Sequence, residues 1–252
     1  MNTNSRVKIM KLQDTIQRTL SVFGYKIQRI NSRDEIKIAM DLINLVSAEL
    51  VLDLGANWGQ FALSIRKAGY RKQIHSYEPD PEVNLKLQRR SKRDKEWHVF
   101  EEAITSKFKL GNGFRILRVA NNSGYSSSLR EPTEGFSKIY NHIRFNMEKR
   151  VKVADLEKVL SRTNVSAIHL KLDIQGSERD VFDGVDLIKC KQIKSIQIEV
   201  SHSQLYEDEW SLSEALKYFS SSGFGLFAFS VEDYNSKTGV VQSNLYFLRV
   251  GS

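Results

Sequence analysis

The chain has 252 residues, of which 40% are hydrophobic and 27% are charged, a composition typical of a globular protein with one large domain. No run approaches 18 apolar residues and the N-terminus lacks the apolar core of a secretory signal, so the sequence predicts neither a membrane span nor secretion. The single cysteine, Cys190, cannot form an intramolecular disulfide, which favours a reducing compartment and a cytoplasmic location.

The formal net charge of +8 is concentrated between Arg66 and Lys95, where ten lysines and arginines accompany four acidic residues. A run of this kind most often forms a solvated helix face. Anionic substrates, membrane surfaces and nucleic acid stay open as alternative partners.

The first part of the chain alternates predicted helices and strands. Residues 1–50 have amphipathic helical spacing and are predicted to form an N-terminal extension before one domain over 51–252. Strands are predicted at 50–55, 73–79 and 98–104, and helices at 60–69 and 80–92. This order is typical of a parallel sheet that is covered by helices.

The alternation breaks between Thr105 and Arg150. Several glycines and the segment NNSGYSSS (121–128) predict a hairpin strand at 113–120 that is followed by a long loop. Long loops inside compact domains are usually functional or disordered, so we expect an insertion at about 105–150 that contacts the substrate.

The alternation resumes after the insertion. The pattern predicts an edge-like strand and a short helix over 150–160, strands at 167–173 and 195–200, a helix at 211–223, and antiparallel strands at 224–230 and 244–250. Ser177 and Asp180 match the S-x-x-[DE] pattern of a capping box, which predicts that they start the helix after Asp173.

Polar residues gather where the predicted parallel strands end, and ligands bind at these ends in open α/β sheets. Gly55 and Gly59 leave the turn after the first strand without Cβ atoms where a ligand would press on the backbone. Glu78 follows Gly55 by 23 residues, a separation that places an acidic side chain at the next strand end, where it can accept both hydroxyls of a ribose. The two features together predict a nucleoside site.

The same turn restricts the kind of nucleoside. It contains neither G-x-G-x-x-G nor G-x-x-x-x-G-K-[ST], so a pyrophosphate ligand is not favoured. Asp53 lies inside the turn, and its carboxylate suits a ligand that carries an ammonium or sulfonium group. The turn therefore points to S-adenosylmethionine as the cofactor.

Three segments of the chain resemble, in order, the motifs of the FkbM-type S-adenosylmethionine-dependent methyltransferases: DLGANWG (53–59), YEPDPEVNLKL (77–87) and HLKLDIQGSE (169–178), with IQIEV after them. The resemblance runs from about Val51 to Val200. It implies an α/β fold, the Rossmann-like class I methyltransferase fold, with a mostly parallel seven-stranded sheet, an antiparallel last strand and helices on both faces. The region 51–252 would then be the methyltransferase domain.

The resemblance also implies roles for individual residues. The cofactor would contact Asp53, Gly55, Ala56, Asn57, Gly59, Glu78, Pro79, Glu102 and Ala103, and Glu102 stands where an asparagine is expected. Asp173 would face the transferring methyl group as the catalytic residue. The acceptor would contact Gln175, Glu178 and Ser127, and Glu199 and His202 at the next strand end are further candidates.

Asp173, Glu199 and His202 are also residue types of an oxygen-rich divalent metal site, but no H-x-x-H or C-x-x-C spacing supports one, so no metal is predicted. Asp173 is predicted to orient an acceptor hydroxyl and accept its proton. Aromatic and basic residues in the insertion suit a phosphorylated sugar or single-stranded RNA.

The sequence therefore favours O-methylation of a small-molecule or glycan hydroxyl, as a sugar in polysaccharide, glycolipid or secondary-metabolite biosynthesis. An RNA methyltransferase and a non-catalytic binding module of the same fold are the alternatives. The sequence predicts no oligomeric state.

Overall fold

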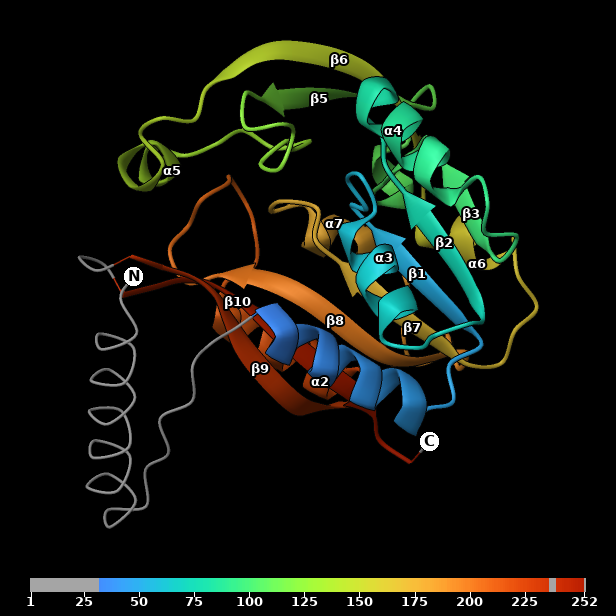
Figure 1. Ribbon diagram of the computed structural model, residues 1–252. Helices are drawn as coiled ribbons and strands as arrows, with labels where there is room; N and C mark the ends of the chain where they lie inside the picture. The colour runs from blue at the N-terminus through green and yellow to red at the C-terminus, as the bar shows by residue number, and fades with distance from the viewer. Residues whose placement is uncertain (1–31, 236–238, 252) are drawn as a thin grey trace, which may run out of the picture. The chain divides into compact units, whose positions relative to one another are not determined.

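The computed structural model describes residues 32–235 and 239–251, and Arg33 to Ser252 form one compact unit (Figure 1). The helical prediction for residues 1–31 lies outside the described residues. The centre of the unit is a seven-stranded sheet in the order β3-β2-β1-β7-β8-β10-β9. Its strands are β1 (Leu50–Leu54), β2 (Gln73–Tyr77), β3 (Trp97–Phe100), β7 (Ile168–Leu172), β8 (Ile193–Ser201), β9 (Phe224–Asn235) and β10 (Gly239–Arg249).

The direction of the strands confirms the predicted class I methyltransferase fold. β1 pairs in parallel with β2 and β7, and the outer pairs β2–β3 and β7–β8 are parallel too. The last strand, β10, runs antiparallel to both β8 and β9. All parallel strands therefore end at one edge of the sheet, where their loops meet.

Helices cover both faces of the sheet (Figure 1). One face packs against α2, α3 and α4 through buried residues such as Ile43, Ile65 and Leu87. The other packs against α6, α7 and α8 through residues such as Val159 and Phe182. The helices are α2 (Ser32–Leu45), α3 (Gln60–Lys67), α4 (Pro81–Ser91), α6 (Leu156–Leu160), α7 (Glu178–Phe182) and α8 (Leu212–Ser221).

Two predicted helix starts are formed as expected. Asp80 caps α4, because its carboxylate accepts the backbone N–H groups of Glu82 and Val83. Ser211 and Glu214 form a complete capping box at α8. Among the described residues, no helix is long and apolar enough to cross a membrane.

The predicted third strand at 98–104 is wrong as one element. β3 ends at Phe100, and the chain then leaves the main sheet so that β4 (Ala103–Ile104) pairs with β6 (Phe145–Ala154). The turn lies at Glu101 and Glu102, and the Glu102 carboxylate pairs with Arg162 beyond α6, 2.6 Å away. A pattern of apolar residues cannot show this change of sheet, because both strands are apolar.

The insertion forms a second sheet of three strands in the order β4-β6-β5. The hairpin strand predicted at 113–120 is β5 (Phe114–Ala120), and it pairs antiparallel with β6. The strand that was expected to be edge-like is thus the middle strand. Residues 121–144 connect β5 to β6 and contain α5 (Glu134–Ile139), while η1 (Lys107–Lys109) precedes β5.

Candidate functional site

The two glycines of the β1–α3 turn are required by the protein's own packing. Gly55 and Gly59 have φ angles of +79° and +87°. A Cβ on Gly55 would lie 1.9 Å from the backbone oxygen of Asp173, and one on Gly59 would lie 2.7 Å from the side chains of Leu87 and Trp97. The turn therefore presses against the tip of β7, and this contact brings the ends of the two central strands together.

Glu78 lies at the end of β2 and holds this turn. One carboxylate oxygen accepts the backbone N–H of Asn57 and the other accepts that of Asp80, both at 2.9 Å. Burial raises the pKa of Glu78 to about 7, although the two N–H groups lower it. Each oxygen keeps a free lone pair, so the carboxylate can still accept two hydroxyl groups.

Asp53, at the end of β1, is fully buried. Its Oδ1 lies 3.3 Å from the Nζ of Lys171 but makes no hydrogen bond, and Ser76 donates only a long hydrogen bond of 3.5 Å to Oδ2. Burial raises the pKa of Asp53, while the Lys171 ammonium opposes this rise. An under-satisfied carboxylate beside the glycine turn fits a cationic ligand group.

The remaining predicted cofactor residues differ in their availability. Ala56 is buried in the turn, and its N–H donates to the carbonyl of Tyr77 at 3.0 Å. Pro79 is half-buried between β2 and α4, and Ala103 is buried in β4. Glu102 is occupied by Arg162, and the Arg162 contacts hold its pKa below the ordinary value although burial alone would raise it.

Asp173 follows β7 and is the accessible carboxylate of the group, with 36% of its side chain exposed. Its Oδ2 lies 3.4 Å from Lys171, and its Oδ1 accepts a hydrogen bond of 3.0 Å from Gln175. Its own N–H donates to the carbonyl of Leu54. The residue is thus fixed to the end of β1 while its carboxylate stays open to solvent.

Gln175 links Asp173 to the predicted acceptor residues. Its side-chain amide also donates to Glu199 at 3.0 Å, and its side-chain oxygen accepts the hydroxyl of Tyr206 at 3.2 Å. Burial raises the pKa values of Glu199 and Tyr206 well above their ordinary range. A polar network next to an open carboxylate can bind hydroxyl groups.

Glu178 is buried and accepts a hydrogen bond from the backbone. Its carboxylate accepts the N–H of Ile174 at 2.9 Å, and burial raises its pKa to about 8. His202 is exposed and shares a hydrogen bond of 2.9 Å with Ser243. Within the described part of the chain, no three His, Cys, Asp or Glu side chains are grouped to hold a metal ion.

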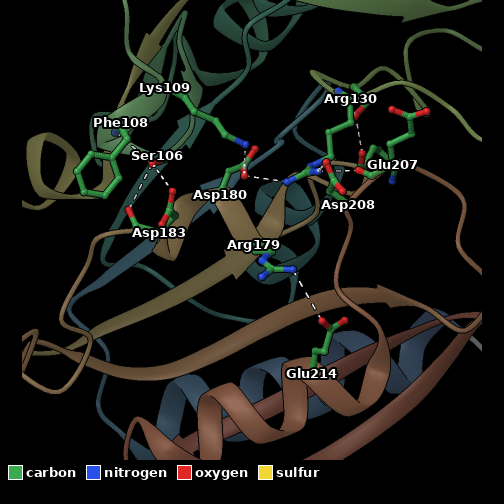
Figure 2. Close-up of polar contacts among 12 residues, drawn as sticks. Ser106, Phe108, Lys109, Arg130, Arg179, Asp180, Asp183, Glu207, Asp208 and Glu214 are labelled. Carbon is green, nitrogen blue, oxygen red and sulfur yellow. Dashed lines mark hydrogen bonds and ion pairs between the residues drawn. The ribbon is translucent and has the colours of Figure 1, made fainter.

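The capping box predicted from Ser177 and Asp180 does not form. Ser177 makes no side-chain hydrogen bond to the helix. The Asp180 carboxylate instead accepts hydrogen bonds from the side chains of Lys109 and Arg130, each at 2.8 Å. Figure 2 shows both basic side chains pointing at Asp180 from the insertion. The sequence pattern failed because distant residues compete for the carboxylate.

The insertion is fastened to both sides of the site. On the cofactor side, Lys149 of β6 donates to Asp80 at 2.8 Å, next to Glu78. On the other side, Ser128 donates to the carbonyl of Gln175 at 2.6 Å, and Tyr206 donates to the carbonyl of Ser126 at 2.9 Å. The insertion is therefore anchored at the start of α4, which follows β2, and at the loop that follows β7.

Ser127 and Phe136 are engaged in packing, whereas Tyr125 is accessible. Ser127 accepts the backbone N–H of Ala120 at 3.1 Å. Phe136 is buried against residues from outside the insertion, among them Tyr206, whereas Tyr125 is 48% exposed. Its ring centroid lies 5.6 Å from that of Trp58, which belongs to the glycine turn. Tyr125 and Trp58 are thus the aromatic pair at the rim of the site.

Sequence reasoning missed two contributors. Tyr206 was not singled out because it lies in a loop of 202–211 without a motif, yet it is fully buried against Gly176. Lys171 was given no role in the site, although it pairs with both Asp53 and Asp173. The signal was present: polar residues alternate with apolar ones in β7, which is unusual for a central parallel strand.

Comparisons with known proteins agree with this geometry. Residues 53–226 match the family model described as the methyltransferase FkbM domain. The 2-O-methyltransferase NoeI of Sinorhizobium fredii is 26% identical over 211 residues, which cover 80% of this chain and 84% of NoeI.

Two solved structures are similar at low identity. Magnesium protoporphyrin IX methyltransferase of Synechocystis is 8% identical, with a TM-score of 0.46 and coverage of 95% of this chain and 96% of that chain. The methyltransferase domain of the bacterial protein CtHen1 is 13% identical, with a TM-score of 0.45 and coverage of 85% and 97%.

Proposed function

Because the chain belongs to the FkbM methyltransferase family, we propose that it transfers a methyl group from S-adenosylmethionine to a hydroxyl group of a sugar. The matched relative NoeI, whose name gives a 2-O-methyltransferase, supports an oxygen acceptor. The acceptor would be a small molecule or a glycan in polysaccharide, glycolipid or secondary-metabolite biosynthesis. We place the reaction in the cytoplasm and assign no metal to it.

Bound S-adenosylmethionine would supply an electrophilic methyl group on a sulfonium. Glu78 would accept the ribose hydroxyls, for which its two carboxylate oxygens keep free lone pairs. Asp53, which pairs with Lys171 beside the glycine turn, would place its negative charge near the cationic methionine part. The backbone of Gly55 to Gly59 would surround this part, and Pro79 and Ala103 would lie near the base. Glu102 is the weakest of these assignments, because Arg162 holds it.

One observation carries the proposal: an accessible carboxylate, Asp173, is fixed beside the glycine turn while the insertion spans both. Asp173 would orient the acceptor hydroxyl and take its proton as the oxygen attacks. Gln175 and Glu199 would bind neighbouring hydroxyls. Ser127 of the insertion and His202 after β8 would be further acceptor contacts, and buried Glu178 would act through the backbone of Ile174.

RNA methylation is the alternative, and the contacts of the insertion's basic residues argue against it. Arg118 pairs with Glu131, Arg130 with Asp180, and Arg144 donates to two backbone carbonyls. Side chains that are already engaged are poorly placed to track a phosphate backbone.

The test incubates the purified protein with S-adenosylmethionine labelled in the methyl group and with extracted glycans, lipids and RNA from the source cell. We expect label in a glycan or lipid fraction. Label in RNA alone would support the alternative, and a titration without cofactor binding would leave only a binding module. A steep loss of RNA binding with salt would accompany a true RNA substrate.

Asp173→Asn is the matched variant. It should lower turnover at least about a hundredfold while cofactor binding persists, because a general base contributes factors of this size. Asp94→Asn is the control, since Asp94 also pairs with a basic residue, Arg66, and is similarly exposed, at 30%. Full turnover by Asp173→Asn would remove Asp173 from the mechanism.

A further inference from the structure

β7 presents two different faces. Ile168, Leu170 and Leu172 belong to the core under α6, α7 and α8. His169 and Lys171 point to the other face, where the ring of Phe61 in α3 stacks with His169 and lies 5.4 Å from the Lys171 ammonium. The strand therefore places a lysine inside the layer between the sheet and α3.

The strand register sets what Lys171 meets. Asp53 is its direct partner on β1 and Gln197 its direct partner on β8, so all three side chains share one face. The Lys171 Nζ lies 3.3 Å from Oδ1 of Asp53 and 3.4 Å from Oδ2 of Asp173. In the described part of the chain, Lys171 is the ion-pair partner of both carboxylates, and 9% of its side chain is exposed.

Other acidic groups reach the same ammonium from the neighbouring elements. The charge of Glu199 in β8 helps to raise the pKa of Lys171. Burial raises the pKa of Glu35 in α2, which shares a hydrogen bond with Glu232 of β9, and the Lys171 ammonium opposes this rise. Burial raises the pKa of the Tyr246 phenol in β10 and lowers that of the His169 imidazole; the positive charge of Lys171 opposes the first shift and adds to the second. Burial alone lowers the pKa of Lys171, but the carboxylates outweigh burial and raise it, so the side chain stays charged.

We propose that Lys171 is a positioning residue for the methyl transfer: its ammonium aligns the Asp173 carboxylate beside the acceptor, and its second contact holds Asp53 on the cofactor side. This inference rests on the proposed function. One cation joins the two functional carboxylates because the register of β1 and β7 puts them on either side of it. Without the cation, the carboxylates of Asp173, Asp53 and Glu199 would repel one another.

The test compares Lys171→Gln, which removes the charge, with Lys171→Arg, which keeps it. Lys107→Met is the control, because Lys107 pairs with Glu157 away from the strand ends. The first readout is the affinity for S-adenosylhomocysteine by calorimetry between pH 6 and pH 8. The second is the pH profile of kcat and KM with the extract fraction that takes label from the wild-type protein.

For Lys171→Gln, we expect the acidic limb of the kcat profile to move at least about one unit to higher pH, with acceptor KM little changed. Its affinity for S-adenosylhomocysteine should weaken about tenfold from pH 8 to pH 6, whereas the wild type and Lys171→Arg stay nearly flat. Lys171→Arg should keep kcat within about tenfold of the wild type.

A purely structural lysine would give a different result. Lys171→Gln would then lose activity equally at every pH, and the two variants would behave alike; either outcome overturns the proposal. If the neutral variant does not fold, a shifted pH profile in Lys171→Arg overturns it. No methyl transfer by the wild type to any fraction would instead refute the proposed function and leave the binding readout to judge Lys171.

Discussion

Gly55→Ala tests whether the contact between the β1 turn and β7 builds the site. A positive φ of this kind costs an alanine about 1–2 kcal/mol by itself. Gly55 has a φ of +79° and Gly223 one of +82°, but nothing lies within 4 Å of a Cβ on Gly223. Gly223→Ala is therefore a matched control that contains the backbone cost without the close approach.

At Gly55 the Cβ meets the Asp173 carbonyl at 1.9 Å, where ordinary contact begins at 3.4 Å. The turn and the tip of β7 must separate by more than 1 Å, and a misplacement of about 1 Å at a reacting group can cost about a hundredfold in rate. We expect Gly55→Ala to lose at least about 3 kcal/mol of stability, against about 1–2 kcal/mol for Gly223→Ala.

Urea unfolding followed by tryptophan fluorescence measures both losses, and calorimetry with S-adenosylhomocysteine measures the site. Gly55→Ala should bind this ligand at least about tenfold more weakly, whereas Gly223→Ala should bind it normally. Equal losses of stability in the two variants, or normal binding by Gly55→Ala, would show that the close approach does not shape the site.

Two further predictions concern buried carboxyl groups with raised pKa values. Glu78→Gln should weaken S-adenosylhomocysteine binding at least about tenfold in calorimetry, because a single amide oxygen cannot accept both backbone N–H groups and the ribose hydroxyls. Folded Glu78 has a pKa of about 7, so its stabilising contribution is complete below pH 4.5 and is lost as pH rises through 7, and Glu78→Gln should lack this pH dependence in urea unfolding. Glu178 has a pKa of about 8 in the folded protein, so the wild type should lose at most about 5 kcal/mol of stability between pH 4.5 and about 8. Glu178→Gln should not show this loss when urea unfolding is measured over that pH range. An unchanged pH dependence in Glu178→Gln would mean that this carboxyl is not neutral in the folded protein.

The sequence predicted the main sheet well because its signals are local. The apolar run of β1 ends at Gly55, and Asp80 with Pro81 starts α4 through contacts within a few residues. The third strand was mispredicted because the change of sheet after Phe100 depends on pairing with β6, more than 40 residues later. Ser177 precedes α7 as predicted, but the capping box is absent, because the Asp180 N–H donates to the Ser177 carbonyl and the Asp180 carboxylate pairs with Lys109 and Arg130.

The residues of the candidate site likewise fall into those that local sequence signals locate and those that depend on distant contacts. Asp53, Glu78 and Asp173 were predictable because strand ends and spacing locate them, and parallel pairing then brings them to one edge. What no short pattern contains is how these carboxylates are held. Lys171 pairs with Asp53 and the backbone N–H of Asn57 binds Glu78, both from neighbours that are distant in sequence.

The way in which the insertion is fastened indicates where acceptor choice is decided. Lys149 ties it to Asp80 beside the cofactor residues, and Arg130 ties it to Asp180 beside Asp173, and both ion pairs are largely shielded from solvent. Ion pairs of this kind are costly to break, because an unpaired buried charge would remain. The strands β5 and β6 are therefore a fixed frame. We expect the segment 121–128, whose Tyr125 contacts Trp58 of the glycine turn, to meet an incoming acceptor. Specificity should accordingly change with substitutions at exposed Tyr125 and half-buried Trp58, while the sheet below keeps the cofactor and Asp173 in place.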